Sequence, residues 1–213
     1  DDPRWGHVYP LKVRSDAQDA YQRFANQYEA QTGLKLKYLR TDNDRAFFSI
    51  SDRLEEDGRR TAPDSSYQNG IAERRIQTVD RRASVMIFHA NAPIAFWLQA
   101  VFCSNYITNL LPTSALGGIS PYEKKYGRPP DLSHLRAWGC RAYAHIPKKL
   151  RRKYAKKAHA CIFIGYDLDG SNGFTSTTYR LWDPLARKLR RSAPNFVTFI
   201  ETEFPWRVQV DPI

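Results

Sequence analysis

The sequence predicts an α/β protein that is mostly helical, with few strands, in its N-terminal half and has a small β-domain in its C-terminal half. Apolar residues recur at helical spacing through most of 71–111. Prolines and glycines then crowd residues 112–130, and beyond them short β-like runs alternate with turn residues. We therefore expect one domain over 1–111, a Pro/Gly-rich linker over 112–135, and a β-domain over 136–204.

The N-terminal third alternates strand and helix signals. Residues 5–13 are rich in β-branched and aromatic side chains, which indicates a strand. Ser15 or Asp16 then caps a helix whose apolar residues keep helical spacing until Gly33 ends it. Residues 34–39 alternate apolar and basic side chains, as in a strand with one buried face.

Helices follow in the rest of this half. A short helix is expected over 47–57, followed by a loop over 59–69 whose composition is that of turns. A long helix is expected from residue 71 to about residue 90, with one apolar stripe. Pro93 lies near the first turn of a further helix, which runs to about Leu111 and is apolar on most faces.

The C-terminal half contains four short β-like runs separated by basic or Gly/Asp-rich turns. Closely spaced short strands are typical of a small barrel or sandwich. We expect a polar loop within 172–179, just ahead of the third run. The strands are predicted at 142–146, 160–165, 178–182 and 196–200.

Composition limits the class of protein. Of 213 residues, 42% are hydrophobic and 13% aromatic, which indicates a globular chain. We see no apolar run near the roughly 20 residues that span a bilayer and no charged-then-apolar leader. We therefore expect an intracellular protein without a membrane partner. The three cysteines are widely spaced, so we expect buried thiols and neither a disulfide framework nor zinc.

The positive charge lies almost wholly in the C-terminal half. Residues 1–112 carry 15 Lys and Arg against 14 Asp and Glu, whereas residues 113–213 carry 18 against 8. Such a surplus indicates a polyanion, and we expect DNA or RNA as the partner. The alternatives are a solvated surface or, for the run at 148–157, a nuclear import signal. The predicted nucleic-acid-binding residues are Arg74, Arg75, Lys148, Lys149, Arg151, Arg152, Lys153, Lys156, Lys157, Arg187, Lys188, Arg190 and Arg191.

Two carboxylates have the setting of metal ligands. Asp42 follows a predicted strand, and Glu73 opens a predicted helix after Gln68, Asn69 and Gly70. Carboxylate oxygens suit Mg²⁺ or Mn²⁺, and a third carboxylate would allow a two-metal attack on a phosphodiester. A turn-capping aspartate and a first-turn glutamate are the structural alternatives.

The same segments resemble the integrase of copia-type retrotransposons. The matching words are DDPRWGHVYPLK at 1–12, LRTDN at 39–43, TAPDSSYQNGIAERR at 61–75, HANAPIAFW at 89–97, SPYEKKYGRPPDLSHLR at 120–136 and CIFIGYDLDGS at 161–171. The resemblance implies a partial RNase H-like integrase core followed by an SH3-like β-domain, from a Gag-Pol polyprotein. Intact relatives are expected to be nuclear, oligomeric and Mg²⁺-dependent, and to integrate element DNA with three carboxylates.

The resemblance assigns two of those carboxylates. Asp42 resembles the second catalytic aspartate and Glu73 the catalytic glutamate, while the first aspartate is expected upstream of residue 1. The glycines that follow the family's Asp-Asn are replaced at 44–46, and the 31 positions from Asp42 to Glu73 are about five too few. The shortfall falls near 58–61, where the family has a strand. We therefore expect little sheet in this half and no productive metal binding.

Two functions remain open at this point. The family role is metal-dependent strand transfer during DNA integration, for which this chain would be inactive by itself. The alternative is a non-catalytic remnant that binds nucleic acid through its basic C-terminal half. A decayed reading frame without function is a third and weaker reading.

Overall fold

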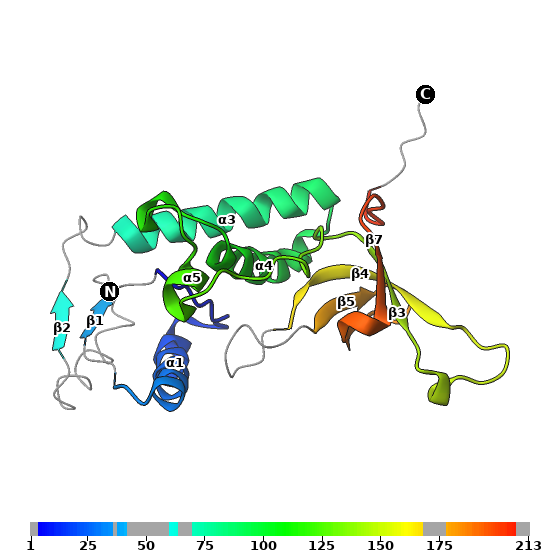
Figure 1. The fold of residues 1–213 in the computed structure, drawn as a ribbon, viewed down its shortest axis with the longest axis horizontal. Coiled ribbons are helices and arrows are strands. Elements are labelled where there is room, and N and C mark those ends of the chain that lie inside the picture. The colour runs from blue at the N-terminus through cyan, green and yellow to red at the C-terminus, as the bar shows by residue number, and fades with distance from the viewer. Residues whose placement is uncertain (1–3, 36–37, 42–59, 64–69, 168–177, 208–213) are drawn as a thin grey trace, which may run out of the picture. The chain divides into compact units, whose positions relative to one another are not determined.

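The computed structural model describes residues 4–35, 38–41, 60–63, 70–167 and 178–207 (Figure 1). The chain divides into two compact units. One unit is formed mainly by Val8–Thr78, and the other by Asp1–His7 with Val79–Asp169 and Gly173–Ile213. The boundary falls within helix α3 (Gly70–Ala90).

The first unit is built around helix α1 (Ala17–Thr32), which follows the short 3₁₀ turn η1 (Arg14–Asp16). Asp16 Oδ2 accepts hydrogen bonds from the backbone N–H groups of Lys12 and Val13 at 3.2 and 3.3 Å, which fixes the entry to the helix. Gly33 ends the helix with a left-handed φ of 67° and donates its N–H to Glu29 O at 2.9 Å. The predicted helix is confirmed.

The sheet of this unit is a parallel pair, β1 (Tyr38–Thr41) and β2 (Arg60–Pro63), in which Leu39 faces Thr61. The first strand begins later than the predicted 34–39. The second strand, β2, shows that the loop predicted over 59–69 is wrong at residues 60–63. Its composition is that of a turn, but pairing with β1 supplies hydrogen-bond partners to its backbone. The helix predicted over 47–57 lies outside the described residues.

The strand predicted over 5–13 is wrong, since the described residues 4–13 form no ladder. Asparagine side chains of α4 (Trp97–Leu110) bond the backbone of Gly6 instead. Gly6 N–H donates to Asn109 Oδ1 at 3.0 Å, and Gly6 O accepts from the amides of Asn105 and Asn109 at 2.9 Å each. The backbone N–H and C=O of Gly6 are therefore bonded to side-chain amides in place of a neighbouring strand.

In the second unit the predicted helices are present. Helix α3 matches the predicted long helix, and α4 follows a 3₁₀ turn, η3 (Ile94–Phe96). The predicted linker carries two ordered elements, η4 (Ser114–Leu116) and helix α5 (Pro121–Tyr126). The domain boundaries at 111 and 136 stay a prediction.

Five antiparallel strands form the sheet of the second unit, in the order β6-β5-β4-β3-β7. All four predicted strands are present. The strand missed by the sequence pattern is β6, an edge strand whose mostly exposed, basic residues show no apolar alternation. The strands are β3 (Arg141–His145), β4 (Ala158–Tyr166), β5 (Tyr179–Asp183), β6 (Lys188–Ser192) and β7 (Val197–Ile200), with the 3₁₀ turns η5 (Lys148–Leu150) and η6 (Pro194–Phe196) between them.

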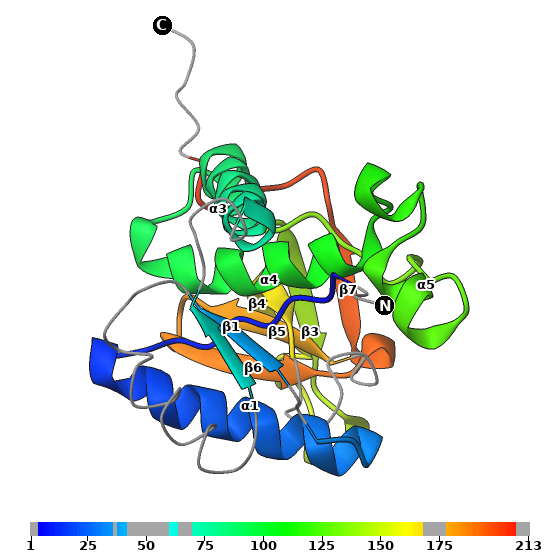
Figure 2. The ribbon, with the colours of Figure 1, turned by 90° about the vertical axis from the view of Figure 1, so that its left-hand side faces the viewer.

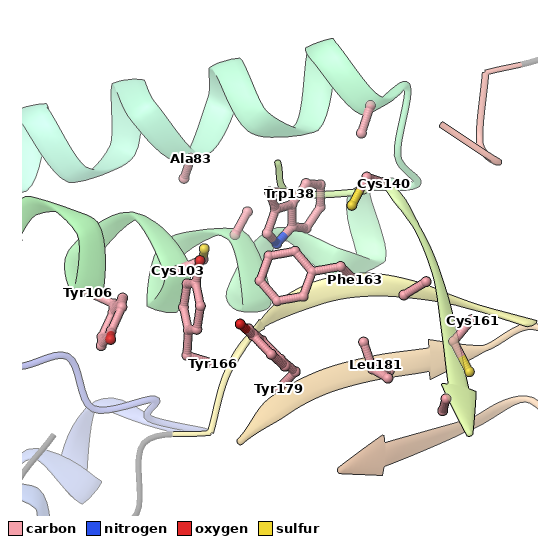
Figure 3. Packing of buried hydrophobic residues seen from close by; sticks show 14 of the residues in the cluster. Ala83, Cys103, Tyr106, Trp138, Cys140, Cys161, Phe163, Tyr166, Tyr179 and Leu181 are labelled. Carbon is pink, nitrogen blue, oxygen red and sulfur yellow. The ribbon is translucent and has the colours of Figure 1, made fainter. Parts of the chain in front are cut away.

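Helices and sheet share one hydrophobic core. Helix α4 lies along β4, and Ala83 and Cys103 from the helices pack in one cluster with Trp138, Phe163 and Leu181 (Figures 2 and 3). Phe163 is fully buried and meets Tyr166, Tyr179 and Phe199 edge to face. The mixed fold class predicted from the sequence, with a β-domain in the C-terminal part, is confirmed.

Gly139 allows the end of α3 to touch the start of the sheet. Its φ is +85°, and a Cβ at this position would lie 2.3 Å from the Cβ of Ala90, which is fully buried. Only glycine tolerates both the backbone and the approach. The contact fixes the C-terminal half of α3 on the β-domain.

Contrary to the sequence expectation, the segment Ile94–Leu116 is long and apolar enough to cross a membrane by length and composition. Of its most apolar 18-residue window 39% is buried, and α4 supplies Cys103, Tyr106 and Leu110 to the core. Ser104, which is also buried, donates its hydroxyl to Val79 O at 2.8 Å. These contacts are those of a core helix.

The predicted burial of the three cysteines is confirmed. Cys103, Cys140 and Cys161 are free and buried. Burial raises the pKa of the Cys103 and Cys140 thiols to about 12 and that of Cys161 to about 11. These protonated thiols are packing groups.

Candidate nucleic-acid interface

The predicted carboxylate pair is described only in part. Glu73 lies exposed in the first turn of α3, and Asp42 lies outside the described residues. Thr41, the residue before Asp42, pairs with Pro63, so β1 and β2 end together at one edge of the parallel pair. Within the described part of the chain, no three His, Cys, Asp or Glu side chains gather as metal ligands. The metal site stays a prediction.

The predicted arginines of α3 lie close to Glu73 in the chain. Arg74 folds back along its own helix, where Nε donates to Gly70 O at 2.9 Å. Arg75, on the next position, is half-buried. Both arginines belong to a different compact unit from the basic residues of the sheet.

The strongest concentration of charge lies in the connection between β3 and β4, residues 146–157, which we call the basic loop. Its base is closed by a hydrogen bond from Ile146 N–H to Lys157 O at 2.9 Å. The turn η5 follows, with Arg151 N–H bonded to Lys148 O at 3.2 Å. A second turn is closed by Ala155 N–H and Arg152 O at 3.0 Å. The loop is therefore a hydrogen-bonded scaffold.

All seven predicted cations of this loop are brought together on that scaffold. Six are exposed and the seventh, Arg151, is half-buried. Residues 146–157 contain no Asp or Glu, and no acidic side chain of the described chain forms an ion pair with any of the seven. Their charge is therefore available to a partner. The seven are Lys148, Lys149, Arg151, Arg152, Lys153, Lys156 and Lys157.

The second predicted cluster lies on the hairpin of β5 and β6, which we call the basic hairpin, residues 179–192. Here Arg190 is engaged within the fold. Its Nε donates to Asp183 Oδ2 at 2.8 Å, and its terminal nitrogen lies 3.2 Å from His159 Nδ1. The carboxylate is buried and also accepts from Ala186 N–H at 2.9 Å.

These contacts shift two ionisation equilibria. The Ala186 N–H and the Arg190 guanidinium hold the pKa of Asp183 below its usual value, against the opposing effect of burial. Burial lowers the pKa of His159, and the nearby Arg190 charge lowers it further. The group is therefore an ionised carboxylate paired with an arginine beside a neutral imidazole.

The other three predicted residues of the hairpin differ in whether an acidic side chain pairs with them. Arg191 Nε lies 2.8 Å from Asp167 Oδ2, so its charge is also compensated. Arg187 occupies the connection between the strands with a left-handed φ of 50° and is exposed, as is Lys188. Of the four predicted hairpin cations, two are thus exposed without an acidic partner among the described residues, compared with six of the seven in the basic loop.

The aromatic residue of the basic loop was not among the predicted site residues. Tyr154 lies between Lys153 and Lys156, and its side chain is almost wholly exposed. The signal in the sequence is a single aromatic residue inside a run of cations, which is typical of surfaces that bind nucleic acid.

Comparison with known proteins agrees with this architecture. Residues 140–212 match the family described as the retroviral polymerase SH3-like domain, and this range contains all five strands from β3 to β7. The retrovirus-related Pol polyprotein from transposon TNT 1-94 of Nicotiana tabacum is 36% identical over 201 residues, which cover 92% of this chain. The chain belongs to the integrase region of copia-type retrotransposon Pol polyproteins.

Two Arabidopsis thaliana relatives extend the match. The Pol polyproteins from transposons RE2 and RE1 are 30% and 28% identical over 171 residues, or 79% of this chain. This integrase-region chain spans only 14%, 12% and 12% of the three relatives' lengths.

Among solved structures, a similar chain comes from the cryoEM structure of the simian T-cell lymphotropic virus intasome in complex with PP2A regulatory subunit B56 gamma. The TM-score is 0.41 at 11% identity, covering 90% of this chain and 66% of that chain. A likeness at this level carries no argument about function.

Proposed function

We propose that this integrase-region chain binds DNA through the basic loop, as part of a polyprotein whose family role is DNA integration. The observation that carries the proposal is the set of seven cations on a hydrogen-bonded loop, with no acidic partner among the described residues. Lys and Arg side chains neutralise phosphates and release counterions, so the binding is independent of sequence and sensitive to salt.

The expected salt dependence follows from the number of phosphates contacted. For duplex DNA, the slope of log K against log salt is about −0.9 for each phosphate neutralised. With all seven cations in contact, the basic loop would give a slope of about −6. A slope near zero would mean that the basic loop does not contact the phosphates of the DNA backbone.

A salt titration with charge-matched variants tests the proposal. Replacing Lys148, Lys149 and Lys153 with Gln should weaken binding of a 20-base-pair duplex and reduce the slope by about 3. The matched control replaces Lys12, Arg23 and Lys35 with Gln, which changes the net charge equally but leaves the basic loop intact. Equal weakening by the two triple variants would show that only the overall charge matters.

We also propose that these 213 residues by themselves do not catalyse strand transfer. They supply two of the three carboxylates that the resemblance implies. Asp42 and Glu73 would hold Mg²⁺ or Mn²⁺, whose chemistry is activation of the attacking oxygen.

A strand-transfer assay with Mn²⁺ tests this second point. We expect no joined product from the purified chain above the background of Asp42→Ala. Product that depends on Asp42 would overturn the proposal and give the chain the family's activity. Product that is equal in the two samples would come from a contaminant, and we expect its removal by further purification.

The non-catalytic alternative is favoured by the charge asymmetry, since residues 113–213 carry 18 Lys and Arg against 8 Asp and Glu. A nuclear location follows from the same family role, and we propose it on that ground. A fluorescent fusion of the chain should collect in the nucleus, and neutralising the basic loop tests whether that loop is the import signal.

A further inference from the structure

Tyr154 is an aromatic side chain with almost no protein around it. Tyr154 is 95% exposed, although tyrosine rings usually bury most of their apolar surface. It lies near the middle of the basic loop, with Arg152 and Lys153 before it and Lys156 and Lys157 after it. Packing within the chain therefore does not explain why an aromatic residue occupies this position.

The backbone holds Tyr154 at the tip of a turn. Residues 152–155 form the turn closed by Ala155 N–H and Arg152 O, and Tyr154 is its third residue, with a φ of +68°. Turns that need a positive φ at the third position usually place glycine there. A non-glycine residue in this region is strained, and such strain persists where surrounding structure imposes it and is concentrated at functional sites.

A cation accompanies the ring. Lys153 Nζ lies 5.4 Å from the ring centroid of Tyr154. An exposed aromatic ring flanked by ammonium and guanidinium groups presents a face for a base and charges for the adjoining phosphates. The ring face reaches a base only where that base is unpaired or unstacked, because in a regular duplex both faces are covered by neighbouring bases.

We propose that Tyr154 is a stacking platform for an unpaired base, so that the basic loop binds single-stranded or locally unstacked nucleic acid through both charge and ring. The inference rests on the proposed binding function of the loop and adds the structural class of the ligand. The shared ligand chemistry is an unpaired base on a phosphate backbone, which DNA and RNA both provide.

Anisotropy titrations of the full chain with a 20-residue oligo-dT, a 20-residue oligo-U and a 20-base-pair duplex test the proposal. Tyr154→Ala should weaken oligo-dT binding about 5- to 150-fold, which is the range for loss of one stacked base. In the same variant the salt slope should stay unchanged and duplex affinity should change less than about twofold, because the phosphate contacts remain. Tyr154→Phe should keep the oligo-dT affinity, because the ring face is retained. Equal loss on oligo-U would extend the site to RNA, and loss on oligo-dT alone would restrict it to DNA.

Phe88→Ala is the matched control, since Phe88 is 83% exposed on α3, outside the basic loop. It should leave binding of all three ligands unchanged. Equal effects of Tyr154→Ala on duplex and single strand, or no effect on either, would overturn the stacking role. If the Lys148, Lys149 and Lys153 variant still weakens binding in that case, the proposed binding function stands. Absence of salt-sensitive binding by the unmodified chain would overturn both.

Tyr154→Gly adds a readout of strain. Glycine adopts the left-handed region without steric conflict, so this variant should unfold at a higher temperature than Tyr154→Ala while losing oligo-dT binding to the same extent. A lower unfolding temperature together with unchanged binding would mean that the ring serves folding, and would overturn the proposal.

Discussion

The basic loop and the basic hairpin look alike in sequence and differ in what their charges do. In the hairpin, Asp183 pairs with Arg190 and Asp167 with Arg191. In the loop, no acidic side chain of the described chain pairs with any of the seven cations. A cation that is already paired has little attraction left for a phosphate, because binding would first have to separate it from its carboxylate. The basic loop and the basic hairpin therefore differ in how many of their cations lack an acidic partner among the described residues, and not in how closely their cations are spaced.

The largest effect is expected at the carboxylate that neutralises the hairpin. Asp183→Ala leaves Arg190 and the Ala186 N–H without their acceptor in a buried setting, and should lower the free energy of unfolding by about 3 kcal/mol. Urea unfolding followed by circular dichroism measures it. The control is Asp167→Ala, whose partner Arg191 is 72% exposed, with an expected loss below about 1 kcal/mol. Similar losses in the two variants would contradict the distinction between a structural and a surface pair.

The next prediction compares the two regions directly. Lys148→Gln with Lys149→Gln should weaken duplex binding and reduce the salt slope by about 2. Arg190→Gln with Arg191→Gln removes the same charge and should leave the slope nearly unchanged, because those cations are already compensated. Anisotropy at several salt concentrations measures both. A larger slope change in the hairpin variant would reverse the assignment of the interface.

The third prediction concerns pH and the contact between Tyr106 of α4 and His134. Tyr106 lies with its hydroxyl 2.6 Å from His134 Nε2, and burial lowers the pKa of His134. The folded state therefore resists a proton that the unfolded chain accepts, so stability should fall as pH drops below about 6.5. Urea unfolding between pH 7.5 and 5 should show this slope, and it should be smaller in His134→Gln. An equal slope in that variant would assign the effect elsewhere, for instance to His159, whose pKa is also lowered.

The smallest effect is expected at the hairpin turn. Arg187 has a left-handed φ of 50°, and Arg187→Gly should change the free energy of unfolding by less than about 1 kcal/mol, in the stabilising direction. Thermal unfolding measures it. Duplex affinity should change little, because a single exposed cation is lost. A strong loss of affinity would place the hairpin turn in the interface beside the basic loop.

Local sequence signals, such as apolar periodicity and turn residues, predicted the helices and most of the strands. Helix α1 ends at Gly33, α3 follows its apolar stripe, and the four predicted strands of the β-domain were found from alternation and turn residues. The failures are at segments whose structure depends on a partner. β2 needs β1, β6 needs β5, and residues 5–13 lack the ladder that their composition predicted.

The sequence by itself determined the mixed fold class, the resemblance to copia-type integrase and the positive charge of the C-terminal half, because periodicity, ordered motifs and composition are properties of the chain alone. Only the tertiary structure decided which charges are available and where Tyr154 is presented. The register of β5 and β6, in which Asp183 faces Lys188, allows the Asp183 carboxylate to reach Arg190. Ion pairing and exposure depend on which side chains meet in space, and a linear pattern does not contain that information.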